Sequence, residues 1–348
     1  MRKIIDSHMH IKNFGDMDFD SYFDDYREEK SLHAVNMCAI PLVQSNICNN
    51  IIMCFYKLAR KNTYIHGGIE LNYIPIDNMP KDMDAVTQYK ELMEIGFDGI
   101  KLLEGKPTEH KRIGKNLHHP ELTRLYHEME KDSCHVIMHS NDPDEFWDID
   151  RAPDWAVNAG WTYTDGTYSS YEEIREQTIK ILKSCPNLKL TVAHFFFLSK
   201  EPQLLESLFK KYSNFCVDLT PGGEMYVEFE KNYYYYKDFF NKYSDRLIFG
   251  TDRSYQGDKK YADWLFNVVT TFLGTDKSVL SFDNKELKGL GLTEDKKDAI
   301  FFGNFESRVG KEPKPINKEK FKAYIEKYDF VLTDEERKNI KILMEKYL

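Results

Sequence analysis

Short runs of β-branched or apolar residues alternate with stretches of helical periodicity along most of the 348-residue chain. This alternation is typical of parallel βα units. The runs follow one another at intervals of about thirty residues, the length of one strand, one helix and two loops in a barrel. There are eight: Lys3–His10, Ala34–Val43, Tyr64–Tyr73, Gly99–Glu104, His135–Ser140, Lys189–His194, Phe215–Thr220 and Leu247–Asp252. The sequence therefore predicts an α/β fold, a (β/α)8 TIM barrel.

Capping signals mark the helices between these runs. Residues 84–95 carry an apolar stripe and end before Gly96, a residue type that terminates helices in the left-handed conformation. Ser170 and Glu173 form the pattern of a capping box, which predicts a helix over Tyr171–Lys183.

The pattern changes after the eighth run. Lys311–Pro315 has the composition of an extended linker, and Thr333 with Glu336 forms a capping box for a last helix. We expect a barrel domain over residues 1–310 and a C-terminal helical extension over residues 311–348, packed on the outside of the barrel.

Composition limits the class of protein. Hydrophobic residues make up 41% of the chain, which is enough for a full core. Charged residues make up 30%, which is too many for a membrane protein. No run approaches the roughly 18 apolar residues of a membrane-spanning helix, and the N-terminus lacks the pattern of a secretory signal. The six cysteines show no paired spacing, which favours free thiols in the cytoplasm.

The net charge of -9 argues against nucleic acid as a partner, because nucleic-acid binding depends on clustered lysine and arginine. We expect a small-molecule substrate. The sequence leaves the oligomeric state open, and a homo-oligomer is compatible with it.

Histidines and a carboxylate stand at the C-terminal ends of four predicted strands, the edge of a TIM barrel where active sites lie. They are His8 and His10 on the first strand, His139 on the fifth, His194 on the sixth and Asp252 on the eighth. Because side chains alternate along a strand, Asp6, His8 and His10 are expected on one face. Neutral imidazoles and one carboxylate at converging positions predict a divalent metal site, with zinc as the usual occupant and an open position for water.

Five short motifs occur in order along the chain. They are Asp6–His10, Gly96–Lys101, His139–Pro143, Pro186–Leu188 running into Ala193–His194, and Phe249–Asp252. In these motifs the chain resembles the amidohydrolase superfamily, specifically its amidohydrolase-2 branch of TIM-barrel metal-dependent hydrolases and decarboxylases. The motifs span nearly the whole predicted barrel.

The resemblance implies a ligand set for the metal, namely His8, His10, His139 and Asp252. It also implies that His194 lies close by, as a ligand of a second metal or as a catalytic hydrogen-bonding group.

Lys101 stands where binuclear members of the superfamily carry a carboxylated lysine between two metals, whereas one metal is the norm in this branch. We expect one divalent metal, zinc, with manganese or a binuclear site as alternatives. Lys101 is then a candidate for contacting the second metal or the substrate.

Two reactions are compatible with these motifs. The first is hydrolysis of a small-molecule lactone, amide or ester by a metal-activated water. Asp252 would accept the proton of that water, and His194 would steady the oxyanion or orient the water. The second is the nonoxidative decarboxylation of a carboxylic acid. We expect a hydrolase, with the decarboxylase as the alternative and a metal-binding barrel without catalytic activity as a second alternative.

The interval between the fifth and sixth strands is the longest. It inserts Asp142–Ser170, which carries Trp147, Trp155, Trp161, Tyr163 and Tyr168. Loops of this length in compact domains are usually lids or binding loops. Trp147 and Trp161 are candidates for stacking on a substrate ring, and Arg151, Lys106 and Arg253 for pairing with a substrate carboxylate. The alternative is that the aromatic residues only hold the insertion onto the barrel.

Overall fold

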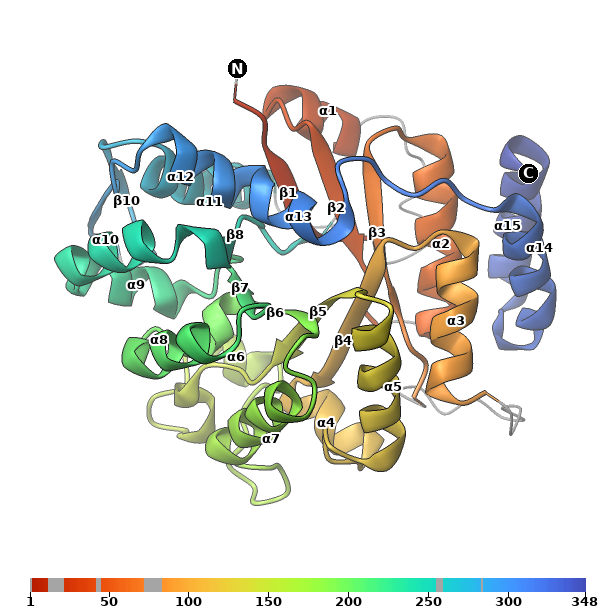
Figure 1. Cartoon of the computed structure of the whole chain (residues 1–348), viewed down its shortest axis with the longest axis horizontal. Helices are drawn as coiled ribbons and strands as arrows, with labels where there is room; N and C mark the ends of the chain where they lie inside the picture. The colour runs from red at the N-terminus through yellow and green to blue at the C-terminus, as the bar shows by residue number, and fades with distance from the viewer. Residues whose placement is uncertain (1, 12–21, 42–44, 72–82, 255–258, 283) are drawn as a thin grey trace.

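A ring of parallel strands forms the centre of the molecule (Figure 1). The computed structural model describes residues 2–11, 22–41, 45–71, 83–254, 259–282 and 284–348. The strands of the ring are β1 Ile5–His10, β2 Ala34–Cys38, β3 Thr63–Gly68, β4 Gly99–Gly105, β5 His135–Ser140, β6 Lys189–Val192, β7 Cys216–Asp218, β8 Leu247–Ile248 and β9 Arg253–Ser254. The predicted (β/α)8 barrel is confirmed; most strands are shorter than the runs that predicted them, whereas β5 has the predicted bounds and β4 ends one residue later.

β8 and β9 are two parts of the eighth strand, and together they close the ring. β8 pairs with β7, and β9 pairs with β1. Between them, the Ser7 amide donates to the Phe249 carbonyl at 3.2 Å and the Asp252 amide donates to the His8 carbonyl at 2.8 Å. These bonds hold the end of β1 against the eighth strand, so their side chains meet at the C-terminal edge.

Helices connect successive strands and cover the outside of the ring (Figure 1). They are α1 Tyr22–Glu29, α2 Asn46–Ala59, α3 Ala85–Ile95, α4 Pro107–Ile113, α5 Pro120–Lys131, α6 Asp154–Asn158, α7 Tyr171–Ser184, α8 Pro202–Lys211, α9 Gly223–Lys231, α10 Tyr233–Lys242, α11 Lys259–Gly274, α12 Glu294–Asp298 and α13 Asn304–Val309. The predicted capping box of Ser170 and Glu173 is present at the start of α7. Gly96 ends α3 with a φ of 112°, and a Cβ there would lie 2.2 Å from the Pro315 carbonyl oxygen, so only glycine fits.

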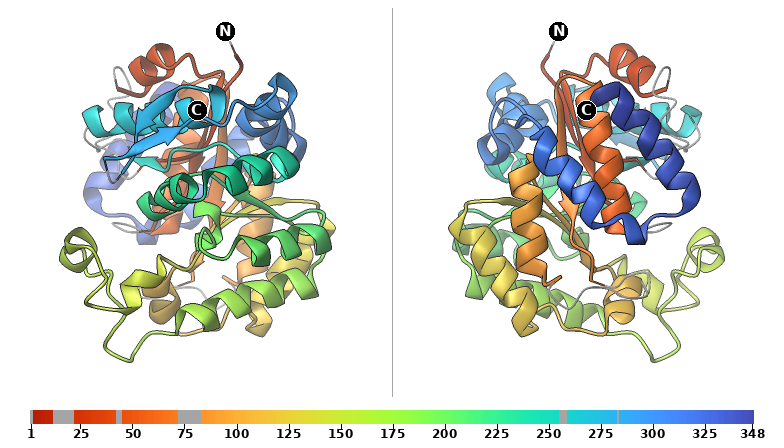
Figure 2. Two further views of the ribbon diagram at one scale, coloured as in Figure 1. Left: turned by 90° about the vertical axis from the view of Figure 1, so that its left-hand side faces the viewer. Right: turned by 90° about the vertical axis from the view of Figure 1, so that its right-hand side faces the viewer.

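The chain ends in α14 Lys318–Lys327 and α15 Asp334–Tyr347, which lie beside α2 and α3 (Figures 1 and 2). The Phe321 ring packs on Phe55 of α2 with 4.9 Å between ring centroids. The Tyr328 hydroxyl donates to Glu91 of α3 at 2.7 Å. The C-terminal helices therefore pack on the outside of the barrel, against α2 and α3, which lie far from them in the sequence.

One element has no counterpart in the predictions. β10 Ser278–Leu280 and β11 Glu286–Lys288 form an antiparallel hairpin after α11 (Figure 2). Leu287 is its buried residue, whereas the residues on either side of Leu287 are exposed. So short a hairpin buries too little apolar surface to produce a clear alternating pattern.

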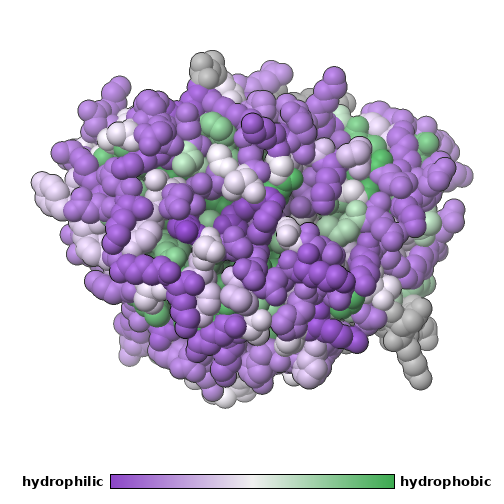
Figure 3. All heavy atoms as spheres, in the orientation of Figure 1, coloured by the Kyte–Doolittle hydropathy of each residue, from purple (hydrophilic) through white to green (hydrophobic). Residues whose placement is uncertain are grey.

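Hydrophobic residues fill the layer between the strands and the helices, and hydrophilic residues cover most of the face seen in Figure 3. Among the helices of the described residues, none is long and apolar enough to cross a bilayer. All six cysteines are buried and carry free thiols.

A polar layer lies inside the ring, below the C-terminal edge. The imidazoles of His66 on β3 and His135 on β5 are hydrogen-bonded, with 3.0 Å between His66 Nε2 and His135 Nδ1. His66 Nδ1 lies 2.7 Å from Asn36 Oδ1, and His135 Nε2 lies 2.9 Å from the Thr191 hydroxyl. A Cβ on Gly99 would lie 2.4 Å from His66 Nε2, so glycine at this position makes room for the pair.

One arrangement of protons satisfies the whole layer with both histidines neutral. The Asn36 amide nitrogen donates to the Ser7 carbonyl at 2.7 Å, so Asn36 Oδ1 accepts from His66 Nδ1–H. His66 Nε2 then accepts from His135 Nδ1–H, and His135 Nε2 accepts from the Thr191 hydroxyl. Burial lowers the pKa of both histidines well below the usual value.

The neutral pair predicts a loss of stability in acid. Below a pH of about 6.5 these histidines bind protons in the unfolded chain and not in the folded chain. Each histidine therefore lowers the free energy of unfolding by up to about 1.4 kcal/mol for every pH unit of acidification. We expect His135→Gln to reduce the slope of unfolding free energy against pH, between about pH 6.5 and 5, by up to this amount. Urea unfolding of the metal-free proteins measures the slope.

His33→Gln is the matched control, because His33 is exposed and its removal should leave the slope unchanged. Equal slopes for His135→Gln and the parent chain would contradict the neutral, buried assignment.

Candidate metal centre

His8 and His10 from β1 meet Asp252 from the eighth strand at the C-terminal edge of the barrel. The Asp252 Oδ1 atom lies 2.9 Å from His10 Nε2 and 3.7 Å from His8 Nε2. One potential ligand atom from each of the three residues lies within 4.8 Å of the others. The imidazoles of His8 and His10 are buried, whereas the Asp252 side chain is 36% exposed, so the group is open from one side.

Hydrogen bonds fix the tautomers of the two β1 histidines. His8 Nδ1 donates to Asp218 Oδ2 at 2.8 Å, and His10 Nδ1 donates to the Cys38 carbonyl at 2.7 Å. Both Nε2 atoms then carry lone pairs that face Asp252. A carboxylate or carbonyl on the far nitrogen is the usual arrangement for a histidine that ligates a metal.

Asp218 stands at the end of β7, and we did not single it out from the sequence. Its second oxygen accepts the backbone N–H of His194 at 2.8 Å, so one carboxylate holds residues of two strands. Burial alone would raise its pKa, but the hydrogen bond from His8 and the neighbouring imidazoles lower it to about 2. Its position at a strand end, like that of the histidines, was the signal that could have revealed it.

Asp6 does not share a face with His8 and His10, contrary to the expectation from simple alternation. The pairing of β1 with β2 shifts register between Asp6 and Met9, as a β-bulge does. Asp6 instead accepts hydrogen bonds from the Thr251 amide at 3.1 Å and the Thr251 hydroxyl at 2.6 Å. Asp6 is therefore bonded to the residue that directly precedes Asp252.

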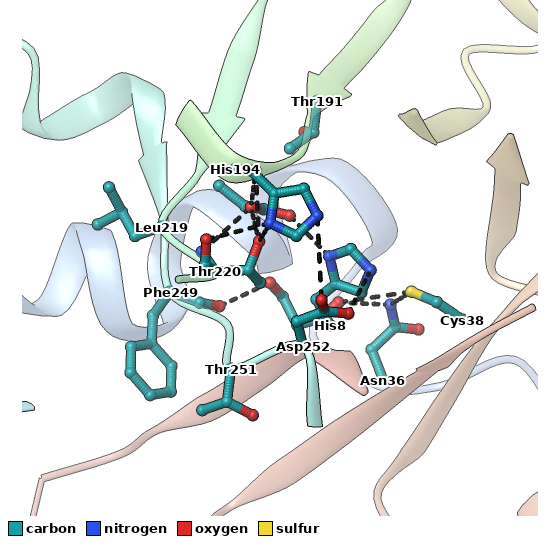
Figure 4. A network of polar contacts seen from close by, with 12 residues as sticks. His8, Asn36, Cys38, Thr191, His194, Leu219, Thr220, Phe249, Thr251 and Asp252 are labelled. Atoms are coloured by element: carbon teal, nitrogen blue, oxygen red, sulfur yellow. Dashed lines mark hydrogen bonds and ion pairs between the residues drawn. The ribbon is translucent and has the colours of Figure 1, made fainter. Parts of the chain in front are cut away.

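His194 and His139 lie next to this group. Figure 4 shows the imidazoles of His8 and His194 facing the Asp252 carboxylate, with 4.0 Å between His194 Nε2 and Asp252 Oδ2. His139 packs on His194 with 4.8 Å between ring centroids, and its Nε2 lies 3.2 Å from Asp142 Oδ1. The structure therefore brings all four histidines and the aspartate of the sequence prediction into one region.

Three of these imidazoles are suited to be neutral ligands. Burial lowers the pKa of His8, His139 and His194 to about 4, so they are unprotonated at neutral pH. His194 Nδ1 lies 3.2 Å from the Thr220 carbonyl, which requires Nδ1–H and leaves a lone pair on Nε2. His139 with Nε2–H directed at Asp142 presents its lone pair on Nδ1.

Two of the candidate residues have left-handed backbones. Asp252 has a φ of 54°, and His194 begins a turn of four residues, His194–Phe197, with φ between 51° and 57°. This conformation costs about 1 to 2 kcal/mol per residue for side chains other than glycine. The rings of Phe195 and Phe196 are fully buried, and their burial offsets the cost. Such strained backbone is concentrated at functional sites.

The donor set fits a divalent cation. The Nε2 atom of His8 is buried and has no hydrogen-bond partner in the described part of the chain. His10 Nε2, with its lone pair, lies 2.9 Å from a carboxylate oxygen, so two electron-rich atoms face each other unless a cation or a proton lies between them. Imidazole and carboxylate ligands match the preferences of zinc, and also those of manganese in part.

Lys101 of β4 lies in the same region. It is 3% exposed, and its ammonium has no hydrogen-bond partner among the residues that the structure describes. Burial lowers its pKa, whereas the charges of Asp252 and Asp218 act to raise it. A buried amine beside the candidate ligands is compatible with both contacts predicted for Lys101, with a second metal or with the substrate.

The insertion between β5 and β6 is held together by its own aromatic residues. Trp147 packs on Tyr163 with 4.7 Å between ring centroids and donates from its indole to the Ser169 carbonyl at 3.0 Å. Trp161 lies against Lys106, with 4.2 Å from Nζ to the ring centroid. Both tryptophans thus contribute to holding the insertion in place.

Asp142 connects the insertion to His139. It binds Lys106 Nζ at 2.8 Å and accepts the Tyr163 hydroxyl as well as His139 Nε2. Lys106, which we considered as a partner for a substrate carboxylate, is therefore already paired within the protein.

The two arginines considered for pairing with a substrate carboxylate contact other groups of the protein. Arg151 is half-exposed and pairs with Asp144 at 3.0 Å and Asp148 at 2.9 Å, both within the insertion. Arg253 is buried, with its guanidinium carbon 3.9 Å from the centroid of the Tyr26 ring. Tyr26 belongs to α1, so Arg253 is directed towards that helix.

Comparison with known proteins identifies the fold. No protein-family model matches the sequence, and neither does any curated protein. A TIM-barrel protein from Bordetella bronchiseptica, described as uncharacterized, matches with 15% identity and a TM-score of 0.53, over 88% of this chain and 98% of that chain. The 2,6-dihydroxybenzoate decarboxylase from Rhizobium matches with 10% identity and a TM-score of 0.52, over 89% and 99%. The chain is a TIM barrel.

A third TIM barrel is a dihydroxybenzoic acid decarboxylase from Polaromonas, solved with manganese and the inhibitor 2-nitroresorcinol. It matches with 12% identity and a TM-score of 0.50, over 89% of this chain and 97% of that chain. At these identities the likeness concerns the fold of the barrel.

The position of Lys101 leads to a prediction about the number of metals. We expect Lys101→Met to retain the metal content of the parent chain, because the predicted ligands of the one ion are the histidines and Asp252. Elemental analysis of the two proteins, purified side by side, measures this. His10→Ala is the control and should lose about one equivalent per chain. A loss of one ion in Lys101→Met would show instead that the lysine contacts a second metal.

Proposed function

We propose that this barrel is a metal-dependent enzyme of the amidohydrolase superfamily, in its amidohydrolase-2 branch, acting on a small-molecule substrate. The cluster of His8, His10 and Asp252 at the C-terminal edge carries the proposal. Its two imidazoles are held by hydrogen bonds from their Nδ1 atoms and are directed at one carboxylate, and a barrel of this kind has its active site at this edge. The family motifs found in the sequence and the solved barrels of similar fold support it.

In this proposal His8, His10, His139 and Asp252 hold one divalent ion, zinc for preference. A bound divalent ion lowers the pKa of water towards neutrality and polarises a carbonyl oxygen.

The protein's own groups supply the proton transfers. Asp252 is a carboxylate with 36% of its side chain exposed, so a substrate and a water can reach it. Burial would raise the pKa of Asp252, but the surrounding histidines favour its charged form and hold the pKa well below its usual range. Asp252 is therefore ionised and can accept a proton from the attacking water and pass it to the leaving group.

The tautomer of His194 limits the hydrogen bonds that this residue can make to a substrate or a water. With the proton on Nδ1, its Nε2 can accept a hydrogen bond or bind a metal but cannot donate to an oxyanion. Of the two functions considered for His194 in hydrolysis, orienting the water by accepting a hydrogen bond from it fits this geometry. Asp218 and Thr220 hold the residue in place through its backbone amide and its Nδ1.

The leading reaction is hydrolysis of a lactone, amide or ester. It requires a general base beside an electrophilic carbonyl, and Asp252 is positioned for that task. The second candidate is nonoxidative decarboxylation of a carboxylic acid, favoured by the similar fold of two dihydroxybenzoate decarboxylases, one of them solved with manganese. In that reaction a carbon–carbon bond breaks, carbon dioxide leaves, and a proton from solvent is delivered to the carbon that carried the carboxylate.

A substrate panel tests the proposed function. The protein, loaded with zinc or with manganese, is incubated with lactones, amides, esters and aromatic carboxylic acids in water that carries an isotopic label on its oxygen. Hydrolysis incorporates label from water into the product, and this is the expected result. Release of carbon dioxide, with no labelled oxygen in the remaining organic product, would select the decarboxylase. No reaction across the panel with the metal bound would favour a metal-binding barrel without catalytic activity.

Asp252→Asn tests the role of the base. We expect the variant to fold normally and to lose about 100- to 10,000-fold in kcat, because the amide cannot accept the proton. Circular dichroism checks the fold and steady-state kinetics on the best panel substrate checks the loss. Asp238→Asn, at an exposed position of α10, is the matched control and should keep parent activity. Turnover near that of the parent in Asp252→Asn would refute the assignment.

A further inference from the structure

Three side chains of metal-ligating type meet on the outer layer of the barrel, away from the centre described above. His127 and Glu130 are on α5, and Cys185 directly follows α7. One potential ligand atom from each lies within 4.8 Å of the others. α5 leads into the start of β5 and Cys185 precedes the start of β6, so the group lies at the N-terminal end of the barrel, opposite the candidate active site.

The distances within the group match a tetrahedral ion. His127 Nδ1 lies 3.4 Å from Cys185 Sγ and 3.8 Å from Glu130 Oε2. Zinc binds nitrogen, oxygen and sulfur at about 2.0 to 2.3 Å, so two ligands of a tetrahedral ion are separated by roughly 3.3 to 3.7 Å. Both observed separations are close to this range.

Two of the three ligands are already held in position. Glu130 Oε1 accepts the Asn187 amide at 2.7 Å, which leaves Oε2 directed at His127. Cys185 donates its amide to the Ile181 carbonyl at 2.8 Å and accepts the Leu188 amide at 3.2 Å. Ligands fixed by their own hydrogen bonds bind a metal without a large ordering cost.

The third ligand gives access from solvent. The His127 side chain is 52% exposed, whereas Glu130 is 19% exposed and Cys185 is buried. An ion can therefore arrive at His127 and keep a water as its fourth ligand.

We propose that His127, Glu130 and Cys185 form a second site for a divalent metal, one of thiolate-binding chemistry such as zinc, which joins α5 to the turn after α7. Burial raises the pKa of the Cys185 thiol, so in the metal-free protein it is protonated and donates to His127 Nδ1. On binding, the ion takes the place of that proton between sulfur and nitrogen, and one proton is released to solvent. The site stabilises the barrel and takes no part in turnover, because functional residues of such barrels lie at the other end.

Cobalt(II) distinguishes this site from the candidate active site, whose proposed ligands include no cysteine. The full chain, freed of metal by a chelator, is titrated with cobalt(II) and its near-ultraviolet absorbance recorded. We expect a sulfur-to-cobalt charge-transfer band that saturates at about one equivalent per chain. The band should be absent in Cys185→Ser and in His127→Ala, and retained in the control Cys134→Ser, which alters a buried cysteine of the same region.

His127→Ala keeps the test valid if Cys185→Ser does not fold, because His127 is half-exposed and its loss disturbs no core packing. Zinc should also raise the Tm of a His10→Ala chain, from which the proposed catalytic site has been removed, and should not do so once His127→Ala is added. A parent chain without the band, or a band that persists in either Cys185→Ser or His127→Ala, would overturn the proposal.

Discussion

The closure of the barrel is the constraint on which the candidate site depends. His8 and Asp252 are far apart in sequence, and they meet because the Asp252 amide donates to the His8 carbonyl while the Ser7 amide donates to Phe249. The same closure places Asp218 of β7 within reach of His8 Nδ1. Without the bonds between the first and eighth strands His8 and His10 would face no carboxylate, and the three residues would not be grouped as candidate ligands.

The interior of the barrel is layered by chemistry. At the N-terminal end Ile5, Tyr64 and Phe305 form an apolar plug. Above it lies the hydrogen-bonded pair of His66 and His135, and above that the candidate ligands. A buried polar layer is tolerated because every donor meets an acceptor in one proton arrangement. This layer reaches the Ser7 carbonyl through Asn36, and so it supports the backbone directly before His8.

The rim of the barrel also bears on the site. Asp142 ties the insertion after β5 to His139, because the same carboxylate holds Tyr163, Lys106 and the His139 imidazole. Burial alone would raise its pKa, but Lys106 and His139 keep it well below its usual range. The aromatic residues of the insertion pack on one another, so their first effect is to hold this rim in a single arrangement.

The sequence by itself determined the barrel and the types of residue at its C-terminal edge. Eight apolar runs at regular spacing leave few folds other than a parallel barrel, and in such a barrel the ends of the strands converge whatever the details of packing. That is why His8, His10, His139, His194 and Asp252 could be grouped from their positions alone. Local signals were equally informative for helices, since the capping box at Ser170 depends only on residues three apart.

Only the tertiary structure decided the finer geometry. A register shift in β1 moved Asp6 to the other face, which no alternation pattern reveals because a bulge depends on how two strands pair. The partners of His8 and of Arg253 come from β7 and α1, and contacts between distant segments are set by packing and not by local sequence. The same holds for His127, Glu130 and Cys185, which are ordinary residues in the sequence and become a possible metal site only where two helices of the barrel lie side by side.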